Sequence, residues 1–389
     1  MIVKPYLIIP NLIRQPTWGG SYIVNYKNIQ LPEIVKEKIG QSYELYEASK
    51  LSTRNSFEIT PALELSDPQN PEKSQKFYSP ESAFSIKELI DKNPTQILGD
   101  KYVKKIGKKI KTLIKLNQGR GNSYQIHVGQ PQGKWLAKPE SWFFLENGLV
   151  TLGAKQGIDW KRYEQVCLQI DNLTKKLGEK VKSGQLSLES AKEELQSFIN
   201  KNNPLQFVNL LTVKQGQAVD LSEGGIHHSW EEDDEICPQG NIVYEVQENV
   251  YDDASTIRSF DKGKIKDDGS SRNLQISDYF RYVNRNPQDN DPQKLLVKPK
   301  IVMETETSVV KQIFSTARYA LQEIEFSRKY EDQTSHSFHH LFVKSGVVQL
   351  VAGETKLTLT PGFSAFVPAA VGFYQVSSKA QAVILKTYL

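Results

Sequence analysis

Histidine is scarce in this chain of 389 residues, with six in total, so each position narrows where imidazole chemistry can occur. His127 ends the segment Ser123-Tyr124-Gln125-Ile126-His127, whose alternation is typical of a strand with Ser123, Gln125 and His127 on one face. An amide oxygen beside an imidazole can hold a divalent cation. The polar face of an exposed strand shows the same pattern, so this segment by itself leaves both interpretations open.

A carboxylate follows in an apolar setting. Glu140 comes two residues after Lys138 and directly before the aromatic run Trp142-Phe143-Phe144. A carboxylate buried among such side chains is destabilised unless it is paired or bound to a metal. Lys138 offers an ion-pair partner, so a salt bridge and metal ligation are both open at this point.

The third candidate segment is Gly224-Gly225-Ile226-His227-His228. A glycine turn delivers an imidazole to the start of a strand here, and loops at sheet ends often carry functional groups. An amide, a carboxylate and two imidazoles form a ligand set that Zn²⁺ accepts while keeping a position open for water or substrate. The chain has two cysteines, which excludes a disulfide framework and a Cys-ligated zinc site.

A helical pattern interrupts the chain after Asp159, where apolar residues recur every three or four positions. The recurring residues are Tyr163, Val166, Ile170, Leu173, Leu177 and Val181. Gly184 can end this helix, and Ser190 with Glu193 resembles a capping box that opens a second one. The stretch 160–202 is therefore predicted to be a helical hairpin whose lysines form a solvated face.

Strand patterns dominate elsewhere. Residues 3–65 contain short apolar runs punctuated by Pro, Gly and Asn, strands return after Pro204, and the C-terminal region alternates most regularly. Ser85 and Glu88 predict one capped helix near the first region. We therefore expect a mainly β chain, built as two related β-barrels with a helical insertion.

Basic and acidic residues nearly balance, with 49 Lys plus Arg, 45 Asp plus Glu and a formal net charge of +4. This charge is too small to indicate a nucleic-acid or membrane partner. A composition of 38% hydrophobic and 24% charged residues is that of a globular protein. The N-terminal run 1–10 is broken by prolines and lacks the apolar core of a signal peptide, and sparse cysteine suits a reducing compartment, so a cytoplasmic location is expected.

Several short motifs stand in order along the chain: Trp18-Gly19-Gly20, Gly40-Gln41-Ser42-Tyr43-Glu44, Ser123-x-Gln125-x-His127, Lys138-Pro139-Glu140, Gly225-Ile226-His227 and Arg258. This order resembles that of type I phosphomannose isomerases, which are zinc-dependent cupins that interconvert mannose 6-phosphate and fructose 6-phosphate. The resemblance implies two cupin-type, jelly-roll β-barrels. Residues 1–158 and 204–290 would form the catalytic one, 159–203 the helical insertion, and 291–389 a degenerate one.

The same resemblance implies roles for individual residues. It implies one Zn²⁺ per chain, with Gln125, His127, Glu140 and His227 as its ligands. Arg258 is implied as a catalytic residue at the sugar and Glu245 as the candidate base, with His228 a weaker candidate. The groups implied for binding the substrate and its phosphate are Lys115, Ser123, Lys138 and Lys264. His336, His339 and His340 are expected to have a structural or interface role.

The partner implied is therefore a small phosphosugar. The stretch between Glu245 and Arg258 is longer than the resemblance leads one to expect. The acidic segment 231–235 likewise lengthens the connection between His227 and Glu245. Two alternatives remain open at this point: a cupin isomerase for another phosphosugar, and a catalytically silent sugar-binding cupin. The oligomeric state is not indicated.

Overall fold

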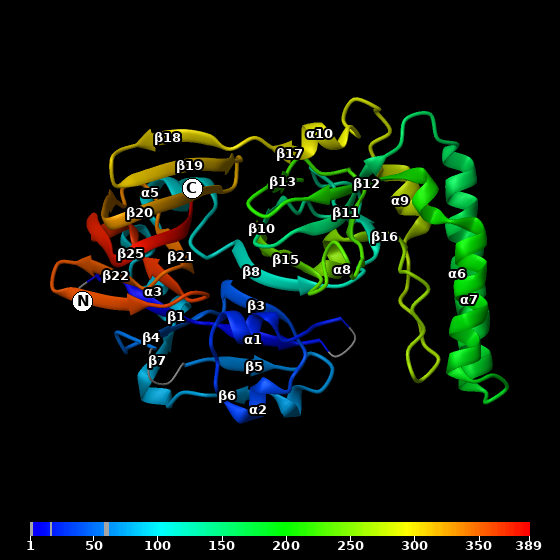
Figure 1. Ribbon diagram of the computed structural model, residues 1–389, viewed down its shortest axis with the longest axis horizontal. Helices are drawn as coiled ribbons and strands as arrows, with labels where there is room; N and C mark the ends of the chain where they lie inside the picture. Colours follow the sequence, from blue (N-terminus) through cyan, green and yellow to red (C-terminus); the bar gives the residue numbers. More distant parts are fainter. Residues whose placement is uncertain (1–2, 16–17, 58–61) are drawn as a thin grey trace.

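The structure is a computed structural model that describes residues 3–15, 18–57 and 62–389; Met1 and Ile2 of the N-terminal run lie outside the described residues. The chain is mainly β, as predicted (Figure 1). Its strands form several sheets, joined by short helices and by one long helical hairpin. No helix among the described residues is long and apolar enough to cross a membrane.

The first sheet contains most of the C-terminal strands. In spatial order these are β18 (Lys300–Glu304), β19 (Ser308–Ser315), β20 (Ala320–Gln333), β25 (Phe373–Tyr388), β21 (His339–Ser345), β24 (Ser364–Val367), β1 (Tyr6–Ile9), β4 (Lys50–Ser52) and β7 (Ala83–Ser85), with β22 (Val348–Ala352) and β23 (Thr355–Leu359) attached beside β25. Three strands from the start of the chain thus join the C-terminal sheet. The division at residues 290 and 291 stays a prediction, and these strands cross it.

The second and third sheets carry the candidate site. The second sheet contains, in spatial order, β17 (Leu296–Val297), β13 (Ala218–Asp220), β10 (Glu140–Phe144), β15 (Asn241–Glu248), β8 (Thr112–Gly119), β3 (Ile39–Leu45), β2 (Asn11–Arg14), β5 (Glu64–Ser66) and β6 (Gln75–Lys76). The third contains β12 (Val208–Val213), β11 (Gly148–Ala154), β14 (His228–Trp230), β9 (Tyr124–Ile126) and β16 (Ile257–Phe260).

These two sheets pack against each other through a buried apolar cluster. Trp142, Phe144 and Val243 come from the second sheet, and Val150 and Trp230 from the third. At the end of this cluster, side chains of β10 and β14 therefore meet between the two sheets. The fold brings together here residues that are far apart in the sequence.

The helices are mostly short connectors around the sheets. They are α1 (Tyr22–Tyr26), α2 (Pro32–Val35), α3 (Ile86–Lys92), α4 (Pro94–Leu98), α5 (Asp100–Lys105), α8 (Asp252–Ser255), α9 (Ile276–Tyr282) and α10 (Pro292–Leu295). Ser85 and Glu88 form the predicted capping box at the start of α3. This box ties down two backbone N–H groups that otherwise lack partners.

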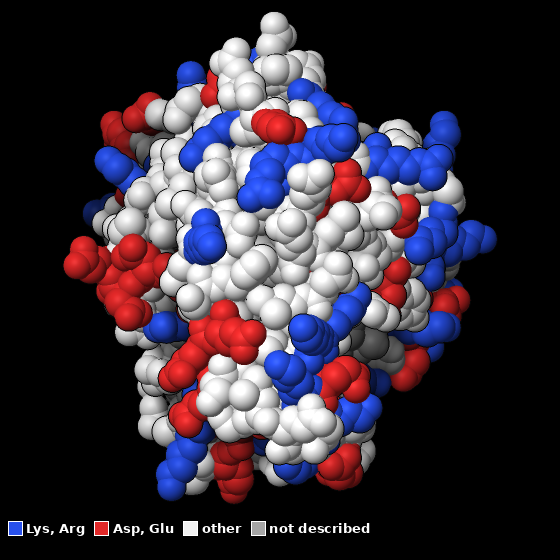
Figure 2. All heavy atoms as spheres, turned by 90° about the vertical axis from the view of Figure 1, so that its right-hand side faces the viewer, with Lys and Arg blue, Asp and Glu red and all other residues white. Residues whose placement is uncertain are grey.

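The predicted helical hairpin is present as α6 (Trp160–Lys182) and α7 (Leu188–Asn202). Its second helix begins earlier than expected, because the Ser187 side chain accepts the Ser190 backbone N–H and acts as the N-cap. The predicted capping box of Ser190 and Glu193 was therefore wrong. The apolar face of α6 packs with α9 on the far side of the third sheet. Figure 2 shows this end of the molecule with basic and acidic side chains interspersed.

Candidate metal centre

Three buried side chains converge between the second and third sheets. The ligand atoms of His127, Glu140 and His228 all lie within 4.8 Å of one another. The rings of His127 and His228 are 5.2 Å apart between centroids. Among the described residues, this is the only group of three or more His, Cys, Asp or Glu side chains that lie close enough together to hold a metal ion.

The hydrogen bonds around His127 fix its orientation. Its Nδ1 lies 2.9 Å from the backbone oxygen of Ser255, which can only accept, so Nδ1 carries the proton. The remaining nitrogen of a neutral ring, Nε2, then turns a lone pair toward Glu140 Oε2 at 3.2 Å. Two acceptors at this distance repel each other unless a cation lies with them. This geometry fits a metal ligand held in place by a backbone partner.

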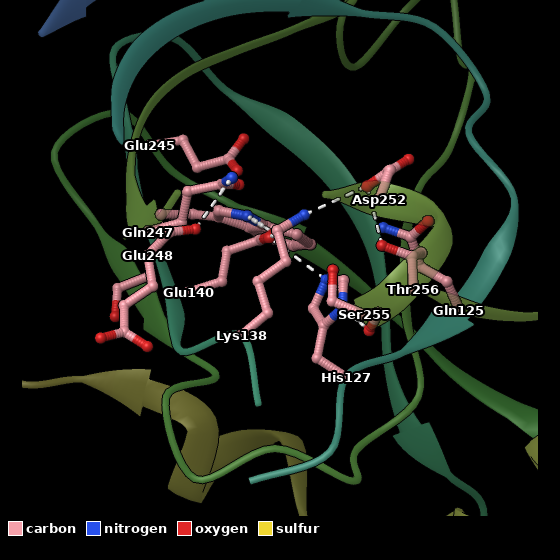
Figure 3. A network of polar contacts seen from close by, with 12 residues as sticks. Gln125, His127, Lys138, Glu140, Glu245, Gln247, Glu248, Asp252, Ser255 and Thr256 are labelled. Carbon is pink, nitrogen blue, oxygen red and sulfur yellow. Dashed lines mark hydrogen bonds and ion pairs between the residues drawn. The ribbon is translucent and has the colours of Figure 1, made fainter. Parts of the chain in front are cut away.

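Glu140 is held from both sides. Its Oε1 accepts a hydrogen bond of 2.7 Å from Trp142 Nε1, which leaves Oε2 facing His127. Lys138 Nζ lies 3.6 Å from the same Oε2. Burial opposes ionisation of Glu140, but the charge of Lys138 holds its pKa well below the usual value. The carboxylate is therefore charged and available as an oxygen ligand. Figure 3 shows it beside Lys138 and His127.

His228 completes the cluster with a neutral imidazole. Burial lowers the pKa of His228 to about 3. Neither of its ring nitrogens has a hydrogen-bond partner among the described residues, and the same is true of His127 Nε2. Buried polar atoms in native proteins are nearly always satisfied. An N- and O-coordinated cation would take one nitrogen from each ring, and so would satisfy His127 Nε2 and one nitrogen of His228 beside the Glu140 carboxylate.

The structure brings His228, and not the expected His227, to this cluster. His228 lies opposite Gln125 in the ladder between β14 and β9, so it shares the sheet face of Gln125 and His127. Side chains alternate along a strand, which turns His227 to the other face. There its ring packs 4.5 Å from Tyr124, and burial lowers the pKa of His227 well below its usual value.

Gln125 lies on the expected face but makes other contacts. Its Oε1 accepts a hydrogen bond of 3.2 Å from Ser123 Oγ. It also lies opposite Arg258 in the ladder between β9 and β16. The strand pattern placed Ser123, Gln125 and His127 together, and the ligand role of Gln125 stays a prediction.

Glu245 lies in β15, next to β10, and is buried. Its two oxygens contact Lys115 Nζ at 3.0 Å and Asn117 Nδ2 at 2.9 Å. Burial and the charge of Glu140 together raise the pKa of Glu245 to about 7. A carboxyl with this pKa can take up and release a proton near neutral pH.

Arg258 is part of a second network at the edge of the site. Its Nε donates to Ser123 Oγ at 3.2 Å, and its Nη2 forms an ion pair with Asp252. The other oxygen of Asp252 contacts Lys138 Nζ at 3.3 Å and accepts from Thr256 Oγ1 at 2.8 Å. Although burial opposes it, Lys138 and Arg258 hold the pKa of Asp252 below its usual value. Lys138 thus joins this network to Glu140 (Figure 3).

This geometry can be compared with known proteins. No protein-family model matches the chain, and no curated protein matches it in sequence. Solved structures do match it. The mannose 6-phosphate isomerase from Bacillus subtilis is 15% identical with a TM-score of 0.65, over 99% of this chain and 100% of that one. That from Salmonella typhimurium, bound to its substrate and to zinc, is 14% identical with a TM-score of 0.66, over 99% of each chain.

The fold is shared with the mannose 6-phosphate isomerases. At these identities the likeness establishes the fold, which extends over nearly the whole length of those enzymes. The expectation of a cupin-type architecture with a helical insertion is thereby confirmed. The reaction and the substrate do not follow from the likeness alone.

Two lysines expected at the phosphate of a mannose 6-phosphate isomerase substrate have partners within the chain. Lys115 pairs with Glu245, which keeps the pKa of Lys115 above its usual value despite burial. Lys264 Nζ donates to the Gly121 backbone oxygen at 2.6 Å. Neither lysine is the free cation that the sequence led us to expect, and their substrate roles stay predictions.

A cleft of about 460 Å³ opens beside the second network. Its lining includes Arg258 and Asp252, together with Lys134 and Arg272. The side chains of Lys134 and Arg272 are 71% and 50% exposed, so both reach solvent. Sequence reasoning missed Asp252, Lys134 and Arg272, because each stands in a loop or a short helix without a distinctive motif.

The three C-terminal histidines do not form a metal site among the described residues. His336 Nδ1 contacts Asp100 at 3.2 Å, His339 Nδ1 contacts the Tyr374 hydroxyl at 2.9 Å, and His340 Nδ1 contacts the Tyr244 hydroxyl at 3.2 Å. Each ring thus has a separate partner. These contacts agree with the structural role expected from the sequence.

Proposed function

We propose that this chain is a zinc-dependent aldose–ketose isomerase that interconverts mannose 6-phosphate and fructose 6-phosphate. The observation that carries the proposal is the buried cluster of His127, Glu140 and His228, in a fold shared with mannose 6-phosphate isomerases. The buried carboxyl of Glu245, whose pKa is raised, favours an enzyme over a silent sugar-binding protein, because perturbed pKa values cluster at catalytic sites.

His127, Glu140 and His228 would hold the zinc ion, and Gln125 is our candidate for a fourth ligand. Zinc bound there would supply the Lewis acidity that polarises the carbonyl and hydroxyl oxygens of an open-chain sugar. The Ser255 carbonyl orients the His127 ring, and Trp142 orients the Glu140 carboxylate. Such outer partners keep ligands in the geometry that the metal requires.

Isomerisation moves a proton between C1 and C2 through an enediol, so the chain must supply a base. We assign this role to Glu245, because a base works best when its pKa lies near the working pH. Lys115 and Asn117 hold its carboxylate in place. His228 is a poorer base, since its free nitrogen is used if it binds zinc.

Arg258 would stabilise the negative charge that develops on the sugar oxygens. Its guanidinium is fixed by Ser123 and Asp252, so little reorganisation is needed when the charge appears. Arginine stays protonated and therefore does not serve as the base. The role of Arg258 is electrostatic.

Phosphate recognition falls to the exposed cations of the cleft in this proposal. A phosphate dianion needs charge-assisted donors, and Lys134 and Arg272 lie with Arg258 around the same cleft. Lys115 and Lys264 contact Glu245 and the Gly121 carbonyl at 3.0 and 2.6 Å. Lys134 and Arg272 also have partners, Asp278 and Asp261, but at 3.6 Å each, and such long, exposed pairs are weak enough for a phosphate to displace. We therefore assign the phosphate to Lys134 and Arg272.

A coupled assay of the zinc-loaded protein with mannose 6-phosphate, free mannose and a panel of hexose and pentose phosphates tests this function. Mannose 6-phosphate should be the best substrate, and removal of zinc by a chelator should abolish turnover. Arg258→Lys should keep the zinc and lower kcat by about 10²- to 10³-fold. Binding of sugar phosphate without turnover would show a silent binding protein, and a preference for another phosphosugar or for free mannose would reassign the substrate.

A further inference from the structure

The outermost strand of the first sheet is unusually exposed. Strand β18 pairs with β19 on one side and ends the spatial order of its sheet, as Figure 1 shows. Ile301, Val302 and Met303 in its centre are 58%, 54% and 38% exposed. Every residue from Lys298 to Thr307 is exposed. An open edge with apolar side chains is a template for pairing with another strand.

The charges around this strand are arranged symmetrically. Lys298 and Lys300 precede the apolar centre, and Glu304 and Glu306 follow it. None of the four forms an ion pair with any described residue of its own chain. Both signs are present in equal number, which does not suit a uniformly charged partner such as an anionic membrane.

A two-fold axis at Val302 would satisfy all four charges. In an antiparallel pair about this axis, Lys300 lies opposite Glu304 of the second copy, and Lys298 lies opposite Glu306. Ile301 then lies opposite Met303, so the apolar centres meet as well. A parallel arrangement would set lysine beside lysine and glutamate beside glutamate, which is destabilising. Of these two arrangements, only the antiparallel one makes the strand complementary to a second copy of itself.

The local backbone limits which strands can pair here. The ladder between β18 and β19 shifts between Ile301 and Met303, which makes Val302 the extra residue of a bulge. Bulges and prolines such as Pro299 protect sheet edges against indiscriminate pairing. An axis at Val302 puts the bulges of both copies at the same level, so their added twist is matched.

We propose that this chain forms a two-fold symmetric homodimer in which β18 pairs antiparallel with β18 of a second copy. The interface extends the first sheet across the axis and leaves the metal centre, which lies between the other two sheets, within each protomer. One short strand per copy is a small contact, so the dimer should exchange with monomer as concentration changes. The proposal does not depend on the catalytic function.

Sedimentation velocity at about 1 to 200 µM protein tests the dimer. The unmodified protein should shift from monomer to dimer as its concentration rises. Lys300→Glu and Glu304→Lys should each weaken dimerisation by at least about tenfold, because each sets like charges opposite one another. An equimolar mixture of these two variants should dimerise again, since every charge then meets its opposite.

Lys356→Glu is the matched control, because Lys356 is exposed on β23, another edge strand of the same sheet. It should dimerise like the unmodified protein. Circular dichroism should show all variants folded, since the exchanged side chains have no partners in the chain. A protein that stays monomeric throughout, single variants that dimerise normally, a mixture that stays monomeric, or assemblies larger than a dimer would each overturn the proposal.

Discussion

The lone pair of His127 Nε2 and the ionised carboxylate of Glu140 determine what can bind between the two sheets. They lie 3.2 Å apart, and the proton that would otherwise separate them is held on Nδ1 by the Ser255 carbonyl. His228 adds a second neutral imidazole. A cation relieves the repulsion and satisfies one orphaned nitrogen of each ring at the same time, which is why we place zinc there.

The two adjacent histidines give a direct test of this centre. His228→Ala should lower zinc affinity by more than about tenfold, since even loss of an outer partner of a ligand costs about 10- to 100-fold. His227→Phe should keep full zinc occupancy, because an aromatic ring can replace the imidazole that packs against Tyr124 and Tyr279. Metal analysis after dialysis measures both. Loss of zinc in the His227 variant alone would restore the expectation from the sequence.

Glu245 gives the reaction its expected pH dependence. A base acts when deprotonated, and the pKa of Glu245 is raised to about 7 by burial and by Glu140. Zinc bound to Glu140 would offset the charge that helps to raise this pKa, so kcat/KM of the zinc-loaded enzyme should begin to fall below pH 7 and then drop by about tenfold for each pH unit below the pKa of Glu245. Glu245→Gln should lower kcat by about 10²- to 10⁴-fold while zinc content stays unchanged. A kcat/KM that does not fall with pH, down to the lowest pH at which the enzyme keeps its zinc, would exclude Glu245 as the base.

Much of this site could be predicted from residue types and order, but not which side chain faces it. The spacing of Ser123, Gln125 and His127 fixed their shared face through strand alternation. For His227 and His228 the same rule applies only when the first residue of β14 is known, and a shift of one position exchanges the two rings. The contacts of Lys115 and Lys264 depend on Glu245 and Gly121, which are more than 100 positions away.

The short helix α8 lies in the segment between Glu245 and Arg258, which is longer than the resemblance led us to expect. It supplies the Ser255 carbonyl to His127 and the Asp252 carboxylate to Arg258 and Lys138. This segment thus connects the metal centre with the charged edge of the cleft. Its effect could not be read from the sequence, because a four-residue helix has no periodic signal.

The helical hairpin was predictable because its apolar spacing continues over many turns. Its packing yields a stability prediction with a control in the same helix. Leu177→Ala in α6 should lower the free energy of unfolding by about 2 to 5 kcal/mol, because Leu177 is fully buried against the layer that includes α9. Leu168→Ala, at a position 39% exposed, should change it by less than about 0.5 kcal/mol. Urea unfolding measures both; equal losses would show that the hairpin does not pack as described.

Strands from the N-terminal region of the chain pair with strands from its C-terminal region. Strand β1 pairs with β24 on one side and β4 on the other, so residues near the N-terminus complete the C-terminal sheet. The Tyr244 hydroxyl contacts His340 and Thr387 across the same boundary. Such pairings link positions hundreds of residues apart, and no local pattern in the sequence specifies them. We expect the two β regions to unfold together.

A buried ion pair at this boundary makes that expectation testable. Lys27 Nζ lies 2.7 Å from Glu44 Oε1 and also donates to the Gly362 backbone oxygen, while Ser364 Oγ donates to Glu44 Oε2 at 3.0 Å. Burial lowers the pKa of Lys27, so the charge depends on its partner.

Lys27→Met should lower the free energy of unfolding by about 3 to 5 kcal/mol, because it leaves Glu44 buried without a counter-charge. The double variant Lys27→Met with Glu44→Gln should recover at least half of that loss, since a neutral amide can still accept from Ser364. Urea unfolding measures the losses. It is followed by tryptophan fluorescence, which does not report the first sheet because all five tryptophans lie outside it, and by far-ultraviolet circular dichroism. If both probes report one coincident transition in each variant, the two β regions form one cooperative unit. A separate early transition of the C-terminal sheet would show that the two regions are independent units held together by the Lys27–Glu44 ion pair.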